Sequence, residues 1–124
     1  MKIVVTSKGE NLSSEMDQRF GRAPYFIIVD TDTSETKAID NKAVSASGGA
    51  GITAGQTMID NSIEAIITGN VGPNAMNVLT TGKIAIYKGL KDTVEKNVEA
   101  FKEGKLDKID TAVSAHYGMG NQGG

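Results

Sequence analysis

The sequence EAIITGNVGPNA, residues 64–75, decides the fold class. Its first half is a short apolar run rich in isoleucine, as in a strand that is buried on both faces of a parallel sheet. Its second half reaches Pro73 through two glycines, and proline is well placed in the first turn of a helix. The stretch therefore predicts a strand at 64–69 that leads, through a short loop, into a helix at 73–81.

The same two signals recur on both sides of this stretch. Further β-branched or aromatic runs predict strands at residues 2–6, 25–30, 35–41 and 83–87. Apolar residues at helical spacing predict helices at residues 52–61 and 90–101. The strand at 35–41 is polar and is expected to pair antiparallel with the strand before it, as an edge hairpin. Strands that alternate with helices after an initial hairpin predict one α/β sheet of five strands, with helices on both faces.

Composition limits the classes of function. The chain has 124 residues, of which 39% are hydrophobic and 23% are charged, a balance that indicates one globular domain. Its formal net charge of -2 offers no basic surface for non-specific binding of nucleic acid. The absence of cysteine excludes disulfides, thiolate-bound metal sites and a cysteine nucleophile in this chain. No signal-peptide pattern and no apolar run of about 18 residues is present, so we expect a cytoplasmic protein without a membrane segment.

The last part of the sequence differs from the rest. Residues 1–105 carry the strand and helix signals and are predicted to be the domain, whereas residues 106–124 are glycine-rich and are predicted to form a flexible tail. The tail holds His116, the only histidine, three residues before the thioether of Met119. This pair makes His116 a candidate metal ligand, and a solvated side chain is the alternative.

Two glycine-containing loops are predicted to end at helix N-termini, where backbone N–H groups can bind an anion. Ligands of open α/β sheets bind outside the carboxyl ends of the strands, and both loops are predicted to lie there. The candidate ligand contacts are Gly48, Gly49 and Gly51 in the first loop, and Thr68, Gly69, Asn70, Gly72 and Asn74 in the second. Glycines that serve only turns and packing are the alternative interpretation of both loops.

A third candidate feature is the polar segment DQRFGRAP, residues 17–24. Its candidate ligand contacts are Arg19, Phe20, Gly21 and Arg22. Two guanidinium groups beside a glycine can clamp an anion by bidentate hydrogen bonds. In the alternative interpretation, Phe20 fills the core, and the arginines are solvated or pair with Asp17 and Glu15.

No catalytic constellation stands out. Gly49, Gly51 and Ala54 have the spacing of a dinucleotide-binding fingerprint, but no apolar strand precedes them and no acidic residue closes the next strand. No lysine and hydroxyl pair follows the glycines as in a phosphate loop, and one histidine in the tail does not make a hydrolytic triad. By themselves the residues are compatible with a ligand-binding protein and leave the function open. An enzyme or sensor that binds a nucleotide or another phosphate in these loops, and a protein-interaction module, stay open as alternatives.

Three stretches resemble one known family. They are RFGRAPYF at residues 19–26, GGAGI at residues 48–52 and ITGNVGPNA at residues 67–75. In this order they are similar to the dinitrogenase iron-molybdenum cofactor biosynthesis family, which includes NifX-like carriers and the C-terminal domain of NifB-like proteins. The resemblance covers residues 1–105. It implies a three-layer α/β/α fold with a ribonuclease H-like motif, whose five-stranded mixed sheet has one antiparallel strand.

The resemblance also implies a function. It indicates a non-catalytic carrier or chaperone that binds an iron-sulfur or iron-molybdenum cluster as cargo, and that receives it from donor proteins or passes it to acceptor proteins. Many members have a histidine, itself a candidate cluster ligand, where this chain has Arg19. Arg19 can still pair with a cluster sulfide or a carboxylate, and His116 is a candidate replacement ligand from the tail. We expect a monomer or a weak homodimer.

Overall fold

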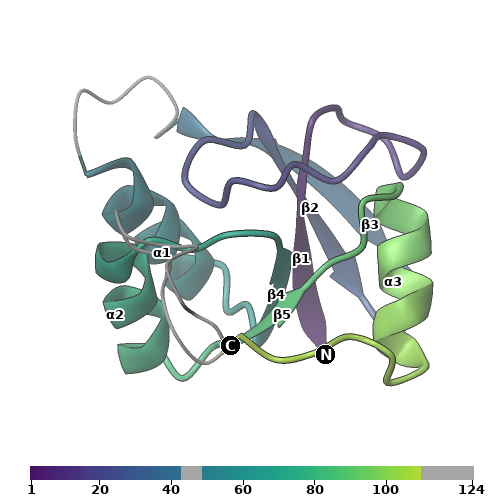
Figure 1. The fold of residues 1–124 in the computed structure, drawn as a ribbon. Helices are drawn as coiled ribbons and strands as arrows, with labels where there is room; N and C mark the ends of the chain where they lie inside the picture. The colour runs from purple at the N-terminus through teal and green to yellow at the C-terminus, as the bar shows by residue number, and fades with distance from the viewer. Residues whose placement is uncertain (43–48, 110–124) are drawn as a thin grey trace, which may run out of the picture.

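The elements alternate along the chain as the hydrophobic pattern predicts. The computed structural model describes residues 1–42 and 49–109 (Figure 1). The strands are β1 (Lys2–Ser7), β2 (Tyr25–Asp30), β3 (Thr36–Asp40), β4 (Ala65–Thr68) and β5 (Ala85–Lys88). The helices are α1 (Ala50–Asp60), α2 (Pro73–Thr81) and α3 (Val94–Lys102). In the part of the chain that the structure describes, no helix is long and apolar enough to cross a membrane.

All five strands form one mixed sheet in the order β3-β2-β1-β4-β5. Strand β1 pairs in parallel with β4, with Val4 opposite Ile66, and β4 pairs in parallel with β5. Strand β2 runs antiparallel to both of its neighbours, β1 and β3. The predicted α/β fold with a five-stranded mixed sheet is confirmed. Because β1, β4 and β5 are parallel, their carboxyl ends lie at one edge of the sheet, where α/β proteins bind ligands.

Each face of the sheet has its own hydrophobic core. Successive side chains of a strand point to opposite faces. Val4 and Ile66 therefore pack with α1 and α2, while Ile3 and Ile67 pack with α3. Figure 1 shows α1 and α2 together on one side of the sheet and α3 on the other. All four side chains are completely buried, which explains why β1 and β4 are continuous apolar runs in the sequence.

Small residues let α1 and α2 approach each other closely. A Cβ at Gly55 would lie 2.8 Å from Cγ1 of Val78, and a Cβ at Gly51 would lie 3.0 Å from the Cβ of Ala75. Both distances are shorter than ordinary van der Waals contact, so the lack of a side chain at these two positions of α1 permits the close approach. The contact places the N-termini of the two helices side by side at the carboxyl edge of the sheet.

The last strand begins later than the sequence predicts. We expected it from residue 83, but β5 begins at Ala85. Lys83 has a positive φ of 60°, and the N–H of Ile84 donates to the carbonyl oxygen of Leu79. Lys83 and Ile84 therefore belong to the turn that ends α2. The pattern of apolar residues does not reveal this turn.

The last helix also begins later than the sequence predicts. We expected it from residue 90, but α3 begins at Val94. Thr93 is its N-cap, and its Oγ1 accepts a hydrogen bond from the N–H of Lys96. Leu90, which we counted on the apolar face of this helix, lies before the cap and is exposed.

Asn97 fixes the loop between β5 and α3. Its buried Oδ1 accepts from the N–H of Leu90 (2.6 Å), and its Nδ2 donates to the carbonyl oxygens of Leu90 (3.1 Å) and Thr93 (2.9 Å).

Asn97→Ala removes these partners, so we expect the free energy of unfolding to fall by about 2–3 kcal/mol. Urea denaturation measures this change. Asn77→Ala, on the exposed face of α2, is the control and should change it by less than about 0.5 kcal/mol; equal values for the two variants would contradict this role.

The end of the described chain packs against the sheet. The N–H of Ile109 donates to the carbonyl oxygen of Ile86 (2.8 Å), and Leu106 is buried in the core that faces α3. Packing on the domain therefore continues beyond residue 105. The remainder of the glycine-rich segment, residues 110–124, lies outside the described residues.

Candidate functional site

The carboxyl edge of the sheet brings two distant segments side by side. The N–H of Asn70 donates to the carbonyl oxygen of Gln18 (2.6 Å), and the N–H of Phe20 donates to the carbonyl oxygen of Asn70 (3.2 Å). The approach requires Gly69, because a Cβ there would lie 2.8 Å from the same oxygen of Gln18. The segment before β2 is thereby fixed against the loop between β4 and α2.

Beside this contact the surface has an open depression of 260 Å³. It is formed by the segment before β2, the N-terminus of α1 and the N-terminus of α2. Its lining residues are Gly21, Arg22, Gly49, Ala50, Gly51, Ile52, Gly72, Pro73, Asn74 and Ala75. The first two segments touch through their backbones, since a Cβ at Gly21 would lie 3.1 Å from the nitrogen of Gly51. The depression therefore exposes mostly backbone and small side chains.

Among the described residues, no side chain caps either helix at the depression. Helix α1 starts after Gly49, which has a φ of 69°, helix α2 starts after Gly72, and neither first turn holds an acidic residue. Helix α3 has both features: Thr93 accepts from the N–H of Lys96, and Glu95 lies in its first turn. The first-turn N–H groups form the positive end of the helix dipole. The N-termini of α1 and α2 thus offer backbone donors and positive potential to one anion.

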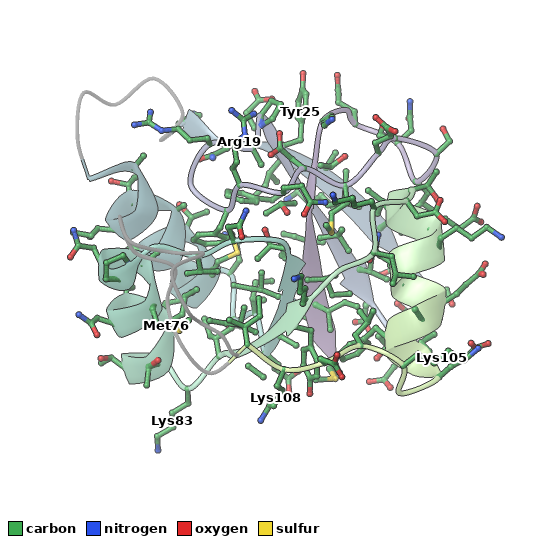
Figure 2. The ribbon with its side chains drawn as sticks, viewed as in Figure 1. Arg19, Tyr25, Met76, Lys83, Lys105 and Lys108 are labelled. Atoms are coloured by element: carbon green, nitrogen blue, oxygen red, sulfur yellow. The ribbon has the colours of Figure 1, made fainter. Side chains whose placement is uncertain are left out.

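Arg19 lies at the same edge, held by Asp17. Its Nε and Nη2 donate to Oδ1 (3.1 Å) and Oδ2 (3.0 Å) of Asp17, and its backbone N–H also donates to Oδ1 (2.9 Å). Figure 2 shows Arg19 and Tyr25 at this end of the molecule, and Lys83 and Lys108 at the other end. Arg19 is thus a guanidinium fixed in place beside the depression.

The pair also sets the charge state of Asp17. Burial of the carboxyl favours a higher pKa, but the hydrogen bonds from Arg19 outweigh it and hold the pKa of Asp17 below its usual value. Asp17 is therefore ionised at neutral pH. Because this pKa is lowered in the folded protein, the pair stabilises the fold above the ordinary carboxyl pKa, and this contribution is lost as the pH falls through the lowered value.

A buried hydroxyl pair connects the site to the sheet. Thr6 Oγ1, at the end of β1, lies 2.8 Å from Thr68 Oγ1 at the end of β4 and donates to the carbonyl oxygen of Asp17 (2.6 Å). Both threonines are completely buried. The segment that carries Arg19 is therefore anchored on two adjacent parallel strands, which are the most buried part of the fold.

The depression unites candidate residues from all three motifs. Those that line it are Gly21, Arg22, Gly49, Gly51, Gly72 and Asn74. Arg19 and Asn70 lie on the adjoining segments, paired with each other in a parallel bridge. Gly48 and His116 lie outside the described residues.

Three other candidate residues are buried in the fold and do not line the depression. Phe20 is 1% exposed and its ring centroid lies 5.8 Å from that of Phe26, so its side chain fills the core, as in the alternative interpretation of its segment. The hydroxyl of Thr68 lies against Thr6 inside the fold. Gly69 is buried because the backbone of Gln18 packs on it. The side chains of Phe20 and Thr68 are buried and Gly69 has none, so these residues add no side chain to the lining.

Sequence reasoning missed part of this arrangement. Ala50, Ile52, Pro73 and Ala75 line the depression without chemical groups that a sequence pattern would mark. Asp17 does carry a signal, a carboxylate two residues before an arginine. That spacing does not reveal that Asp17 is buried, with its backbone held at the end of β1.

Other parts of the described chain offer weaker candidates. No group of three or more His, Asp or Glu side chains among the described residues is arranged to hold a metal ion. A larger hollow of 410 Å³ lies near the start of β1 and the C-terminal end of α1, at Asn61. Its charged lining residues, Lys2, Asp30, Glu35 and Lys37, include both signs. It therefore offers no uniform electrostatic potential to a charged ligand.

Known proteins are similar to this chain in sequence and in fold. A family model described as dinitrogenase iron-molybdenum cofactor matches residues 1–104. An uncharacterized protein of Methanocaldococcus jannaschii is 32% identical over 113 residues, which cover 89% of this chain and 92% of that protein.

Two solved structures are also similar. The apo form of the orange protein from Desulfovibrio gigas has a TM-score of 0.84 at 34% identity, over 87% of this chain and 92% of that chain. A Thermotoga protein named as a candidate NifB protein has a TM-score of 0.82 at 32% identity, over 92% of this chain and 97% of that chain. Because the family model and these relatives cover nearly the whole domain, this protein belongs to the dinitrogenase iron-molybdenum cofactor family.

Proposed function

We propose that this protein binds an anionic iron-sulfur or iron-molybdenum cluster as cargo in the depression, and carries it during the assembly or transfer of a metal cofactor. The observation that carries the proposal is the convergence of two helix N-termini, free of acidic residues in their first turns, on one depression. The sulfides of such clusters accept hydrogen bonds from backbone N–H groups. The family to which the chain belongs supports the same cargo.

The proposed site combines backbone donors with arginine. Arg22 lines the depression and Arg19 lies on the adjoining segment. The chain has no cysteine, so no thiolate of this protein binds the iron. Hydrogen bonds and charge hold a cluster less permanently than thiolate ligands do, which suits a carrier that receives its cargo from one protein and releases it to another.

The proposal describes a carrier and not an enzyme. Among the described residues, the polar groups that line the depression are backbone amides, Arg22 and Asn74. The described lining includes no carboxylate, imidazole or thiol, the side chains that most often act as general acid or base. We propose that residues 1–105 form the binding domain and act as a monomer or a weak homodimer.

Anaerobic titration with isolated iron-molybdenum cofactor tests the proposal. Visible absorption measures the affinity, and the shifts of backbone amide signals in NMR spectra locate the site. We expect saturable binding, with the largest shifts at residues 19–24, 49–52 and 69–74. ATP, titrated in parallel, should leave these amides unshifted, and His116→Ala measures whether the tail adds a ligand.

Two outcomes would overturn the proposal. If ATP shifts the same amides and the cofactor does not, the depression binds a phosphate, as in the alternative that the sequence leaves open. If neither ligand binds, the glycine-containing loops serve packing, and the protein acts through contacts with other proteins.

A further inference from the structure

Asp17 and Arg19 form an ion pair in which one member is buried and the other is exposed. The side chain of Asp17 is 2% exposed and that of Arg19 is 63% exposed. The backbone of Asp17 is anchored to the end of β1, because its N–H donates to the carbonyl oxygen of Thr6 (2.9 Å) and its carbonyl oxygen accepts from Thr6 Oγ1 (2.6 Å). The carboxylate therefore has a fixed position, and it fixes the guanidinium.

The carboxylate contacts one side of the guanidinium and leaves another side available. Arg19 Nε donates to Oδ1 and Nη2 donates to Oδ2 of Asp17, which is a side-on bidentate contact. A guanidinium has five N–H donors in a rigid planar fork. Both N–H groups of Nη1 and one of Nη2 therefore point away from Asp17, and no described residue accepts from Nη1. Together Nη1 and Nη2 form a second bidentate donor.

The pair has no net charge, and this makes its role testable. Removing the charge of Asp17 would leave one additional positive charge at the site, and Coulomb attraction alone then predicts tighter binding of an anion. Removing the contact would also free the side chain of Arg19, which must then lose rotamer freedom when the anion binds. Charge and positioning therefore predict opposite changes in affinity.

We propose that Asp17 is a positioning residue for cluster binding, which presents the free Nη1 and Nη2 donors of Arg19 to the anion in the depression. The inference rests on the proposed function. Arg19 pairs in register with Asn70 on the segment that leads to Gly21, the first residue of the lining. Arg19 thus acts as a directed hydrogen-bond donor, while the helix N-termini supply positive potential.

The test is the affinity of Asp17→Asn for isolated iron-molybdenum cofactor, measured by anaerobic titration. We expect binding to weaken about tenfold, as when a residue that orients a ligand-binding group is removed. Glu15→Gln is the matched control, because it removes one negative charge from a nearby side chain that is 73% exposed and contacts Lys8. Its affinity should be unchanged or slightly higher. An Asp17→Asn variant that binds as tightly as this control would overturn the positioning role.

A second variant covers the case in which Asp17→Asn folds poorly. Arg19→Lys keeps the charge on an exposed side chain but lacks the planar fork, so we expect a folded protein with about the same tenfold loss. The double variant Asp17→Asn/Arg19→Lys should bind no more weakly than either single variant, because both changes remove one interaction. Wild-type affinity in Arg19→Lys would contradict the inference.

The NMR signal of the Arg19 Nε–H in the cargo-free protein separates this inference from the proposed function. We expect slow exchange with water in the wild type and fast exchange in Asp17→Ala, which has no side-chain acceptor for this proton. If the wild-type protein shows the protected signal but binds no cluster, the proposed function is refuted, and the role of Asp17 in cluster binding is refuted as well. A wild-type protein that binds the cluster no better than Asp17→Asn refutes the role of Asp17 alone.

Discussion

Gly72→Asp is expected to stabilise the fold and to abolish cluster binding. Gly72 is the N-cap of α2, with a φ of -73° and a ψ of 168°, and a Cβ there would meet no atom within 4 Å. Aspartate is among the best N-cap residues, because its carboxylate accepts from first-turn N–H groups and interacts favourably with the helix dipole. We expect the free energy of unfolding to rise by about 0.5–1 kcal/mol.

The carboxylate introduced by Gly72→Asp also opposes binding of the cluster. It accepts from the N–H groups at the start of α2, and it places a negative charge in the depression. Like charges brought together in a binding site cost several kcal/mol, so we expect the affinity for iron-molybdenum cofactor to fall by at least about 100-fold. Urea unfolding and anaerobic titration of the same sample measure the two opposite changes.

Thr93→Asp is the matched control for this variant. Thr93 is the N-cap of α3, on the opposite face of the sheet, where its hydroxyl already accepts from the N–H of Lys96. The substitution adds the same charge at the same position of a helix, and we expect an affinity within about twofold of the wild type, because salt screens distant exposed charges. If Gly72→Asp binds as well as Thr93→Asp, the N-terminus of α2 does not belong to the binding site.

Gly69→Ala is expected to destabilise the protein severely. The added Cβ would lie 2.8 Å from the carbonyl oxygen and 2.9 Å from the Cα of Gln18, and it would also contact the Oε1 of that residue. The amide end of the side chain can move, but the backbone of Gln18 is held by its 2.6 Å hydrogen bond from Asn70. Overpacking of this kind costs about 1–3 kcal/mol, and we expect the upper half of this range.

Thermal unfolding measures this loss. For a domain of this size we expect the Tm to fall by roughly 4 °C for each kcal/mol. Gly72→Ala, in the same loop, is the control: its Cβ enters open space at an ordinary φ, and the loss of a glycine N-cap should cost no more than about 1 kcal/mol. Equal Tm values for Gly69→Ala and Gly72→Ala would show that the two segments separate without strain, and that their contact does not support the site.

The hydrophobic pattern is a reliable guide to the elements where local and tertiary preferences agree. Strand β2 and helix α2 have the predicted bounds, because an aromatic and β-branched run defines the first and a proline in the first turn defines the second. The pattern fails at Lys83 and Leu90. There a positive φ and the threonine N-cap of α3 set the boundaries, and neither depends on hydrophobicity.

The sequence likewise predicts only part of the candidate site. The motifs at residues 19–22, 49–51 and 69–74 identify the loops, because glycines before helices and paired arginines are chemical signals within a few residues of sequence. They do not show which side chains face a ligand. Phe20 and Arg19 are neighbours in one motif, yet the first is buried in the core and the second is exposed and paired with Asp17.

The sequence by itself determined the alternation of strands and helices, the family and the segments that form the site, because these depend on periodicity and on local turn and cap chemistry. Only the tertiary structure decided that the segments meet. Pairing of β1 with β4 joins residues far apart in the chain, and the backbone contacts of Gly21 with Gly51 and of Gly69 with Gln18 depend on that pairing. Burial of Asp17 also depends on tertiary packing, because no local sequence pattern shows which side chains the neighbouring strands shield from solvent.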